Sequence, residues 1–262
     1  MKLCTRIITA VTNIERRRLI IRRLHEKGSA RVDELSDELN VTRVTIRSDI
    51  SDLEKRGLAV RSRGVIYAPE YGDLPRQVAK TIHERIEEKE LISSLVAPMV
   101  EPGMTIILDA GSTNVVLAQS LHNKSITVVT NSVPVILELS ADPEIDLIVS
   151  GGVLRKPSMS MVGEFSRGLY SHIHADIAFL GANGVSFEKG PSSPNLLEAE
   201  TKRSIIKAAD TVCLLVDSSK FGKTQMAQIC GWDSISLIVT DSMSDELRDR
   251  FDEIGVKVLL PT

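Results

Sequence analysis

The chain has 262 residues, of which 42% are hydrophobic and 26% charged, and its formal net charge is -3 at pH 7. This length suits a small domain followed by a medium one. No stretch approaches the roughly 20 apolar residues of a membrane-spanning helix, and residues 1–18 lack a signal-peptide pattern, so we expect a cytoplasmic protein with no membrane partner. The widely spaced cysteines, with no metal-ligand pattern, favour reduced thiols, no metal site and no cofactor; they are Cys4, Cys213 and Cys230.

Charge is distributed unevenly along the chain. Residues 1–67 carry 15 Lys and Arg against 9 Asp and Glu, a net charge of +6, whereas residues 68–262 carry 17 against 26, a net charge of -9. A basic segment on an acidic remainder indicates a polyanionic partner for the first segment alone.

The basic segment has the apolar spacing of three short helices. The first is predicted over residues 13–27 and ends at Gly28, and the second follows over residues 32–39. The third begins after Thr42, a candidate N-cap, and ends at Gly57. Its apolar face is expected to contain Val44, Ile46, Ile50 and Leu53.

The opposite face of the third helix is polar and basic near its start, as a helix that reads the DNA major groove requires. The following residues 58–69 alternate apolar and basic side chains, which indicates a hairpin or wing. For any single arginine, a solvated basic surface is an alternative. Together the patterns predict a winged helix-turn-helix in residues 1–67 that binds double-stranded DNA through Thr42, Arg43, Thr45, Arg47, Ser48, Arg61 and Arg63.

Residues 68–75 are rich in Pro and Gly and are predicted to be a linker to an effector-sensing and oligomerisation domain, residues 76–262. A long helix is expected over residues 80–99. The strand-like runs beyond it, with helical patterns between most of them, predict an α/β domain with a parallel sheet. These runs cover residues 104–109, 126–130, 145–150, 176–181, 211–217, 236–240 and 256–260.

Polar and glycine-rich segments follow five of these strands, at the sheet edge where open α/β sheets bind ligands. Gly111 allows close approach of a ligand, and hydroxyls and amides at the helix starts suit an anion. Each such residue, taken alone, is more often an ordinary helix cap or turn, and only their convergence at one sheet edge favours a ligand site. The candidate residues are Gly111, Ser112, Thr113, Asn131, Ser132, Arg155 and either Lys220 or Lys223.

Both parts of the chain resemble the DeoR family of bacterial repressors. In the first part the resemblance lies in VDELSDELNV and VTIRSDISDLEKRG; in the second it extends from about Arg76 to Leu260 through DAGSTN, TNS, GGVLR, MVGEFS, FLGANGVS, EAETKR and DSSKFG. It implies a sensor domain similar in fold to ribose-5-phosphate isomerase and glucosamine-6-phosphate deaminase. It also implies a sugar-phosphate pocket lined by Asp109, Ser112, Thr113, Asn131 and Lys220, with Arg155, Asn183, Glu198 and Lys202 as additions.

The resemblance further implies a homodimeric or homotetrameric repressor of a sugar or polyol catabolic operon, controlled by a phosphorylated sugar. The chain departs from the family pattern at Ser48, where a second basic residue often follows TIR, and at Ser62 to Val65, where a His-Gly-Gly motif is common. The operator sequence therefore does not carry over from the family.

Two other functions remain open. An isomerase-like enzyme fused to a DNA-binding head would need a carboxylate base, and the related isomerases use a DGAD-type motif. Here the stretch is GANG, where Asn183 cannot act as a base, although Glu198 remains. An architectural DNA binder with an oligomerisation domain is the third alternative.

Overall fold

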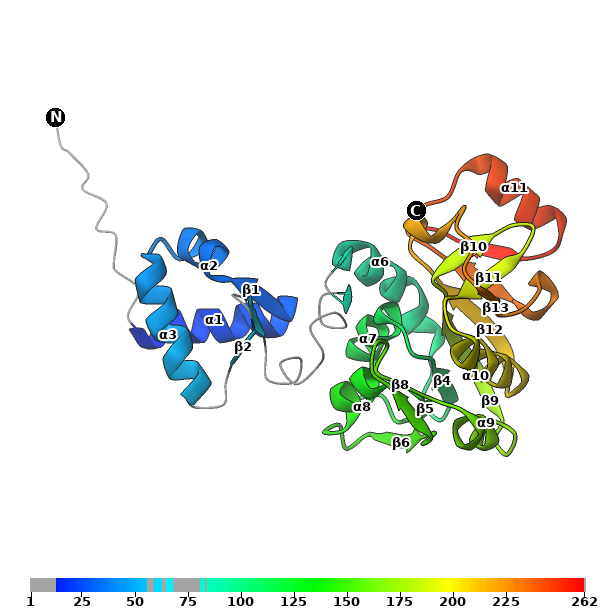
Figure 1. Ribbon diagram of the computed structural model, residues 1–262, viewed down its shortest axis with the longest axis horizontal. Helices are drawn as coiled ribbons and strands as arrows, with labels where there is room; N and C mark the ends of the chain where they lie inside the picture. Colours follow the sequence, from blue (N-terminus) through cyan, green and yellow to red (C-terminus); the bar gives the residue numbers. More distant parts are fainter. Residues whose placement is uncertain (1–12, 56–58, 63–64, 68–80, 83, 262) are drawn as a thin grey trace. The chain divides into compact units, whose positions relative to one another are not determined.

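Figure 1 shows the protein as a computed structural model, which describes residues 13–55, 59–62, 65–67, 81–82 and 84–261. The chain forms two compact units, residues 1–79, here called the head, and residues 80–262, here called the body. The predicted linker, residues 68–75, lies outside the described residues.

In its described residues, the head contains three helices and a three-stranded antiparallel sheet. The helices are α1 (Asn13–Lys27), α2 (Val32–Glu38) and α3 (Arg43–Lys55), as the apolar spacing predicted. The strands are β1 (Ser29–Arg31), β2 (Val60–Ser62) and β3 (Val65–Tyr67), in the order β1-β3-β2. The hairpin β2–β3 is the predicted wing, whereas β1 was not anticipated, because three residues are too few for a periodic pattern.

The head core lies between the helices and the sheet. Ile46, Ile50 and Leu53 are buried on one face of α3, at spacings of four and three residues. Val44 was predicted to share this face, and that prediction is wrong, since it is 73% exposed. A residue two positions before Ile46 points about 200° away on a helix of 3.6 residues per turn, so Val44 lies on the polar face.

Arginines of α1 clamp this helix onto α3. Arg16 is buried and its Nε lies 2.5 Å from the Asp49 carboxylate. Arg17 joins Asp49 at 2.9 Å and Asp52 at 2.5 Å. These two cations therefore serve packing, and the head presents less positive charge to solvent than its composition suggests.

The body is built around a seven-stranded sheet in which every pairing is parallel, as predicted. The strand order is β15-β14-β12-β9-β4-β5-β6. The strands, which match the seven predicted runs, are β4 (Thr105–Leu108), β5 (Ile126–Thr130), β6 (Ile145–Val149), β9 (Ala175–Gly181), β12 (Ala209–Leu215), β14 (Leu237–Val239) and β15 (Lys257–Leu259).

Helices connect and cover these strands (Figure 1). They are α6 (Ile86–Val96), α7 (Ser112–Gln119), α8 (Val133–Leu139), α9 (Glu164–Tyr170), α10 (Leu196–Lys207) and α11 (Asp245–Glu253), with short 3-10 turns η1 (Ala97–Met99), η2 (Ser218–Lys220) and η3 (Trp232–Ser234). None of the helices within the described ranges has the length and apolarity of a transmembrane segment.

Two small antiparallel sheets lie beside the main one and were not predicted. One is the hairpin of β7 (Val153–Arg155) and β8 (Ser160–Val162). The other contains β10 (Gly184–Ser186), β11 (Gly190–Ser193) and β13 (Ala227–Gln228). Both follow strand exits that the sequence marked as polar loops, so they bring further side chains to that edge of the main sheet.

The long helix predicted over residues 80–99 is shorter in the structure. Its described regular part starts at Ile86, directly after Arg85, which adopts a left-handed conformation (φ 55°). Just before it, the carbonyls of Thr81, Ile82 and Glu84 all accept hydrogen bonds from the buried Lys89 ammonium. These carbonyls converge on one ammonium group, and the left-handed Arg85 marks the point where the regular helix begins.

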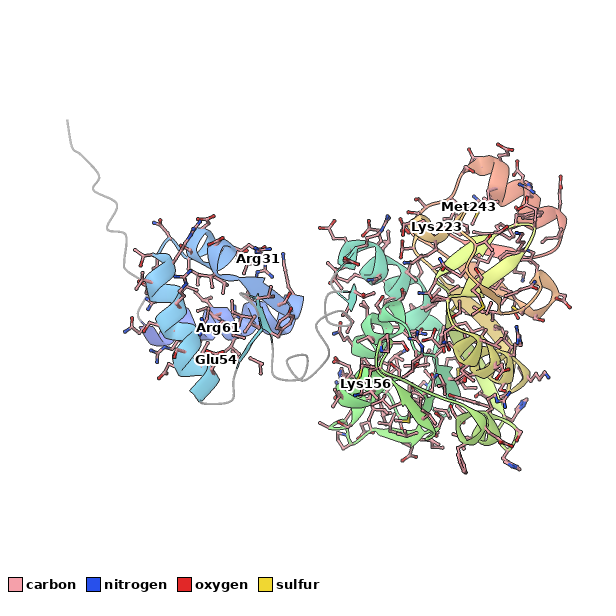
Figure 2. All side chains as sticks on the ribbon, in the orientation of Figure 1. Arg31, Glu54, Arg61, Lys156, Lys223 and Met243 are labelled. Atoms are coloured by element: carbon pink, nitrogen blue, oxygen red, sulfur yellow. The ribbon has the colours of Figure 1, made fainter. Side chains whose placement is uncertain are left out.

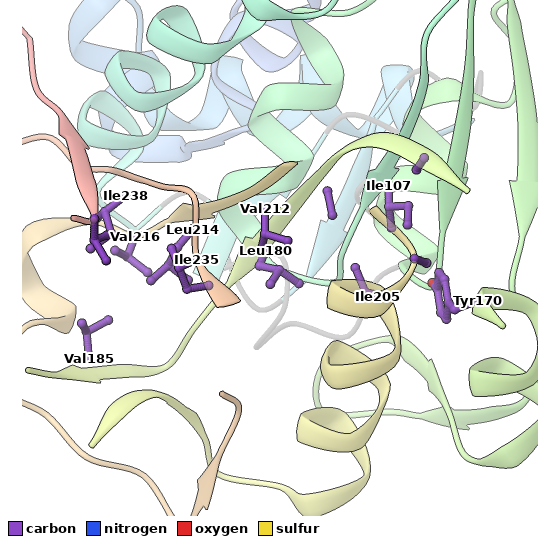
Figure 3. Packing of buried hydrophobic residues seen from close by; sticks show 14 of the residues in the cluster. Ile107, Tyr170, Leu180, Val185, Ile205, Val212, Leu214, Val216, Ile235 and Ile238 are labelled. Atoms are coloured by element: carbon purple, nitrogen blue, oxygen red, sulfur yellow. The ribbon is translucent and has the colours of Figure 1, made fainter. Parts of the chain in front are cut away.

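The main core of the body lies on one side of the sheet (Figure 3). Ile107, Leu180, Val212 and Leu214 come from three adjacent strands and are buried. Cys213 is a buried free thiol within β12, as predicted, and Cys230 is a partly buried free thiol; Cys4 lies outside the described residues.

Candidate functional site

The polar face of α3 carries the residues predicted to meet DNA. Arg43, Arg47 and Ser48 are exposed there, together with Val44. The Thr42 hydroxyl accepts a hydrogen bond from the Thr45 amide at 3.2 Å, which confirms Thr42 as the N-cap. The two hydroxyls also lie 2.9 Å apart, so Thr45 is partly engaged in the cap.

The head arginines differ in their partners. Arg43 pairs with Asp33 of α2 at 2.8 Å, and Arg61 of β2 pairs with Glu54 of α3 at 3.0 Å (Figure 2). For Arg47 the structure shows no ion pair within the described part of the chain. Arg63 lies outside the described residues.

A hollow of about 330 Å³ opens on the head, and sequence reasoning did not anticipate it. Four elements, β1, α2, α3 and β2, line it through Arg31, Val32, Asp33, Arg47 and Arg61. Arg31 was absent from the predicted residues because it precedes α2 in a short strand, with no helical spacing to connect it to the α3 face. The hollow therefore concentrates basic side chains from β1, α3 and β2 in one place.

In the body, the predicted candidates gather where the strand order reverses. From β4 the chain adds β5 and β6 on one side, then returns to place β9, β12, β14 and β15 on the other side. The reversal lies between β4 and β9. The crevice at the carboxyl ends of two such strands is the place where open α/β sheets bind ligands.

Asp109 lies at this reversal, directly after β4. It is 1% exposed, and its Oδ2 accepts a hydrogen bond from the amide of Gly181, at the end of β9, at 3.1 Å. The Lys202 ammonium, 4% exposed, donates to the same oxygen. Burial raises the pKa of the Asp109 carboxyl, and the Lys202 charge opposes that rise. The result is a buried ion pair that joins the two strands to α10.

One face of α10 carries both of its predicted residues. Glu198 stands four residues before Lys202 and so shares its helix face. The Glu198 carboxylate lies 3.1 Å from a guanidinium nitrogen of Arg155, on β7, and accepts a hydrogen bond from the Ser193 hydroxyl at 2.9 Å. The structure therefore brings Arg155, Glu198, Lys202 and Asp109 together.

Asn131 and Ser132 occupy the neighbouring exit, after β5. The Asn131 side chain accepts a hydrogen bond from the Ala110 amide at 3.0 Å and donates to the Met161 carbonyl at 3.3 Å. Ser132 caps α8 and forms a bridge with Ser160 of β8. These residues tie the β7–β8 hairpin to the segment that follows Asp109.

The start of α7 faces this edge of the sheet as well. Gly111 is its N-cap residue and no side chain caps the helix, so the amides of its first turn lack a side-chain acceptor within the described residues. Ser112 and Thr113 occupy the first turn. Gly111 has extended backbone (φ 172°), and a β-carbon there would lie 3.9 Å from Gly181 Cα, an ordinary contact. The protein's own packing therefore does not require glycine here.

Two buried acceptors at this edge lack a partner within the described residues: Asp109 Oδ1 and Asn114 Oδ1. The Asn114 amide group donates to the carbonyls of Asp109 and Phe179, at 2.8 and 2.9 Å. Asn114 was not among the predicted residues because its place at the end of DAGSTN suggested ordinary helix interior. Buried polar atoms are costly unless a ligand or water satisfies them.

No contact among the described residues joins Asn183 or Lys220 to the group around Asp109. Asn183 is exposed before β10. Lys220 lies 3.6 Å from Asp217, at the exit of β12. Arg85 reaches Asp217 and Asp241, each at 3.4 Å, so Lys220 belongs to a second charged cluster at the start of α6.

The comparisons with known proteins cover both units. The DeoR-like helix-turn-helix domain matches residues 16–70, and the DeoR C terminal sensor domain matches residues 84–242. The HTH-type transcriptional regulator GolR of Listeria innocua is 34% identical over 246 residues, which cover 93% of this chain and 97% of GolR.

The chain belongs to the DeoR family. It is accordingly a helix-turn-helix transcriptional regulator with a DeoR sensor domain. Two further relatives are the putative aga operon transcriptional repressor of Escherichia coli O157:H7, 30% identical over 94% of this chain and 93% of its own, and the lactose phosphotransferase system repressor of Staphylococcus epidermidis, 29% identical over 89% and 94%.

Among solved structures, ribose 5-phosphate isomerase A of Methanocaldococcus jannaschii aligns with 51% of this DeoR-family chain and 53% of its own, at 20% identity and a TM-score of 0.38. A similarity this low carries no argument about function. The DeoR sensor domain match includes Lys89, Asp109 and Asn114, and the helix-turn-helix match includes Arg31.

Proposed function

We propose that this protein represses a sugar or polyol catabolic operon and that a phosphorylated sugar, bound at the edge of the body sheet, controls its binding to DNA. The observation that carries the proposal is the cluster of Asp109, Lys202, Glu198 and Arg155 at the strand reversal, in a chain whose head is a DeoR helix-turn-helix. The printed names of relatives, an aga operon repressor and a lactose phosphotransferase system repressor, agree with this assignment.

A sugar phosphate presents a dianion and several hydroxyls, and the cluster offers groups for both. The first-turn amides of α7, at Ser112 and Thr113, suit the phosphate because helix N-terminal amides bind anions. The unpartnered Asp109 Oδ1 suits a sugar hydroxyl donor. Gly111 leaves room for a ligand at the α7 start, and Arg155 supplies a cation that an effector can draw away from Glu198.

Asn131, Ser132 and Lys202 are proposed to shape this pocket through the contacts described above. Asn183 and Lys220 are retained as proposed effector contacts, on the basis of the family resemblance. Lys220 already neutralises Asp217, so its contribution to an anion is proposed to be smaller than that of Arg155.

The proposal includes the absence of catalysis. A general base for isomerisation must be within hydrogen-bond reach of a substrate proton and able to accept it. Glu198 instead accepts a hydrogen bond from Ser193 and pairs with Arg155, which holds its carboxylate in a structural role. This arrangement supports a sensor over an isomerase.

Control of DNA binding requires that the effector prefer one arrangement of the heads. We propose a homodimer or homotetramer that places two heads on symmetric half-sites, as helix-turn-helix proteins do. A coupling free energy of about 1 to 3 kcal/mol between effector and operator binding would change operator affinity by roughly 5 to 150 fold.

The test is a gel-shift titration of the purified chain on DNA upstream of its own gene and neighbouring operon, with and without a panel of sugar phosphates. Competitor-resistant binding that one sugar phosphate changes would support both halves of the proposal. Specific binding that no sugar phosphate alters would favour an architectural DNA binder. Turnover of a pentose or amino-sugar phosphate would overturn the proposed absence of catalysis.

A further inference from the structure

The hollow of about 330 Å³ on the head combines cations from three elements that are distant in sequence. Arg31 comes from β1, Arg47 from α3 and Arg61 from β2. The remaining lining residues are Val32 and Asp33. A hollow with this lining is suited to a small anion more than to an apolar ligand.

Ion pairs around the hollow leave an excess of positive charge. The Asp33 carboxylate is paired with Arg43, and the Arg61 guanidinium is paired with Glu54. Within the described residues, the structure shows no ion pair for Arg31 or Arg47. The two guanidinium groups therefore face the hollow without a carboxylate of their own.

The backbone of Arg31 is fixed, although its side chain is exposed. Its amide donates to the Glu34 carboxylate at 3.0 Å, and its strand pairs with β3, where Arg31 lies opposite Val65. Arg31 thus projects from a rigid point where the sheet and α2 meet. A fixed origin lowers the entropic cost of ordering a long side chain on a ligand.

We propose that Arg31, together with Arg47 and Arg61, binds one phosphate of the DNA backbone in this hollow. The proposal rests on the proposed function, since it assigns a new contact to the DNA-binding head. Guanidinium groups donate planar pairs of N–H bonds that match phosphate oxygens. A phosphate held here fixes the position of α3 in the groove, so Arg31 contributes affinity that does not depend on sequence.

Salt dependence distinguishes a phosphate contact from a structural role. Each neutralised phosphate contributes about 0.9 to the slope of log affinity against log salt concentration. We expect Arg31→Ala to lower that slope by about one and to weaken operator and unrelated duplex DNA by similar factors. The measurement is fluorescence anisotropy of the full chain on both DNAs across a range of salt concentrations.

The matched control is Arg22→Ala, which removes another exposed charge, on α1, at a position that does not line the hollow. Its salt slope should equal that of the unchanged protein. An Arg31→Ala slope equal to the Arg22→Ala slope would overturn the proposal, as would a loss confined to the operator.

A gain-of-affinity variant guards against misfolding as an explanation. Asp33 is the one carboxylate among the described lining residues, so Asp33→Asn should tighten binding to both DNAs and steepen the salt slope. Unchanged or weaker binding would count against the phosphate site. If the unchanged protein binds no operator, the proposed function fails, while unrelated duplex DNA still tests the hollow.

Discussion

At the scale of single residues, the body buries an ion pair at the strand reversal, where we propose that a ligand binds. Asp109 and Lys202 are each nearly inaccessible, and one joins strand ends while the other comes from a covering helix. A buried ion pair adds little net stability over apolar residues of similar volume, because its desolvation costs about as much as its attraction returns. Its retention at the strand reversal is therefore better explained by binding than by stability.

Removing one member of this pair should be costly. Lys202→Met leaves the Asp109 carboxylate buried without its cation, and we expect a loss of about 3 kcal/mol in the free energy of unfolding. The double variant with Asp109→Asn should recover a large part of that loss. Urea denaturation of the full chain measures both, with the exposed Lys207→Met, also on α10, expected to stay within about 0.5 kcal/mol. Equal losses for the two lysine variants would contradict the buried-pair argument.

Lys89 gives the body a pH dependence of stability. Burial lowers the pKa of its ammonium from 10.5 to about 8, against the attraction of Asp217. Between pH 8 and 10.5 the unfolded chain binds more protons at this site than the folded chain, so the Lys89 contribution to stability rises with pH in that range. Below pH 8 the folded state carries the full cost of the buried charge.

The corresponding variant is Lys89→Met. The melting temperature of the unchanged protein, relative to that of Lys89→Met, should increase as the pH is raised from 7 to 10. Thermal melting at four or five pH values measures the difference. A difference that stays constant, or that decreases with pH, would contradict a lowered pKa for the buried ammonium.

At the scale of elements, two adjacent glycines precede the β7–β8 hairpin, and only one of them, Gly152, lies where a β-carbon would clash. Both Gly151 and Gly152 have positive φ, 65° and 108°. A β-carbon at Gly152 would lie 2.7 Å from the Val162 carbonyl oxygen and 3.0 Å from Ser166 Cβ, whereas one at Gly151 would meet nothing within 4 Å. The hairpin carries Arg155 to the candidate pocket.

Gly152→Ala should therefore displace the hairpin, whereas Gly151→Ala should cost only backbone strain of about 1 kcal/mol. We expect Gly152→Ala to weaken effector binding at least tenfold and to leave operator binding in the absence of effector unchanged. Isothermal titration with the sugar phosphate found by gel shift measures the first quantity. Effector affinities that match between the two variants would show that the hairpin position is not set by this turn.

How far the sequence predicts these elements depends on how local their determinants are. Ile46, Ile50 and Leu53 reveal α3 by spacing, and seven apolar runs reveal the parallel sheet. The β1 strand and the two small body sheets are formed by pairings between distant short segments, which no local pattern records. The start of α6 at Ile86 coincides with the left-handed Arg85 and the buried Lys89, and the burial of Lys89 is decided by tertiary packing.

The candidate sites divide in the same way. Loops after strands predicted Ser112 and Asn131 because parallel strands end at a common edge, whereas Asp109 was expected only from the family resemblance. Arg31 and Asn114 escaped prediction, since their importance arises only when β1 meets α3 or when β4 meets β9. Lys220 follows β12 as predicted, but its ion pair is with Asp217 and not with the Asp109 cluster.

At the scale of the whole molecule, the two units are expected to divide binding between them. Arg47 belongs to the head and lines the hollow beside Arg31, whereas Arg155 belongs to the body and pairs with Glu198. If allostery couples two distinct sites, each site must be separable by substitution while its partner still binds.

Arg47→Ala should weaken operator binding at least tenfold, because it removes a contact of the recognition helix, yet the effector should still raise the melting temperature. Arg155→Ala should bind operator normally and lose the effector response. Gel shifts and thermal melting on both variants test this reciprocity. If Arg155→Ala lost operator binding without effector present, the body cluster would be required for the assembly that binds DNA. The effector would then act by releasing Arg155 from Glu198 rather than by filling a pocket that is already formed.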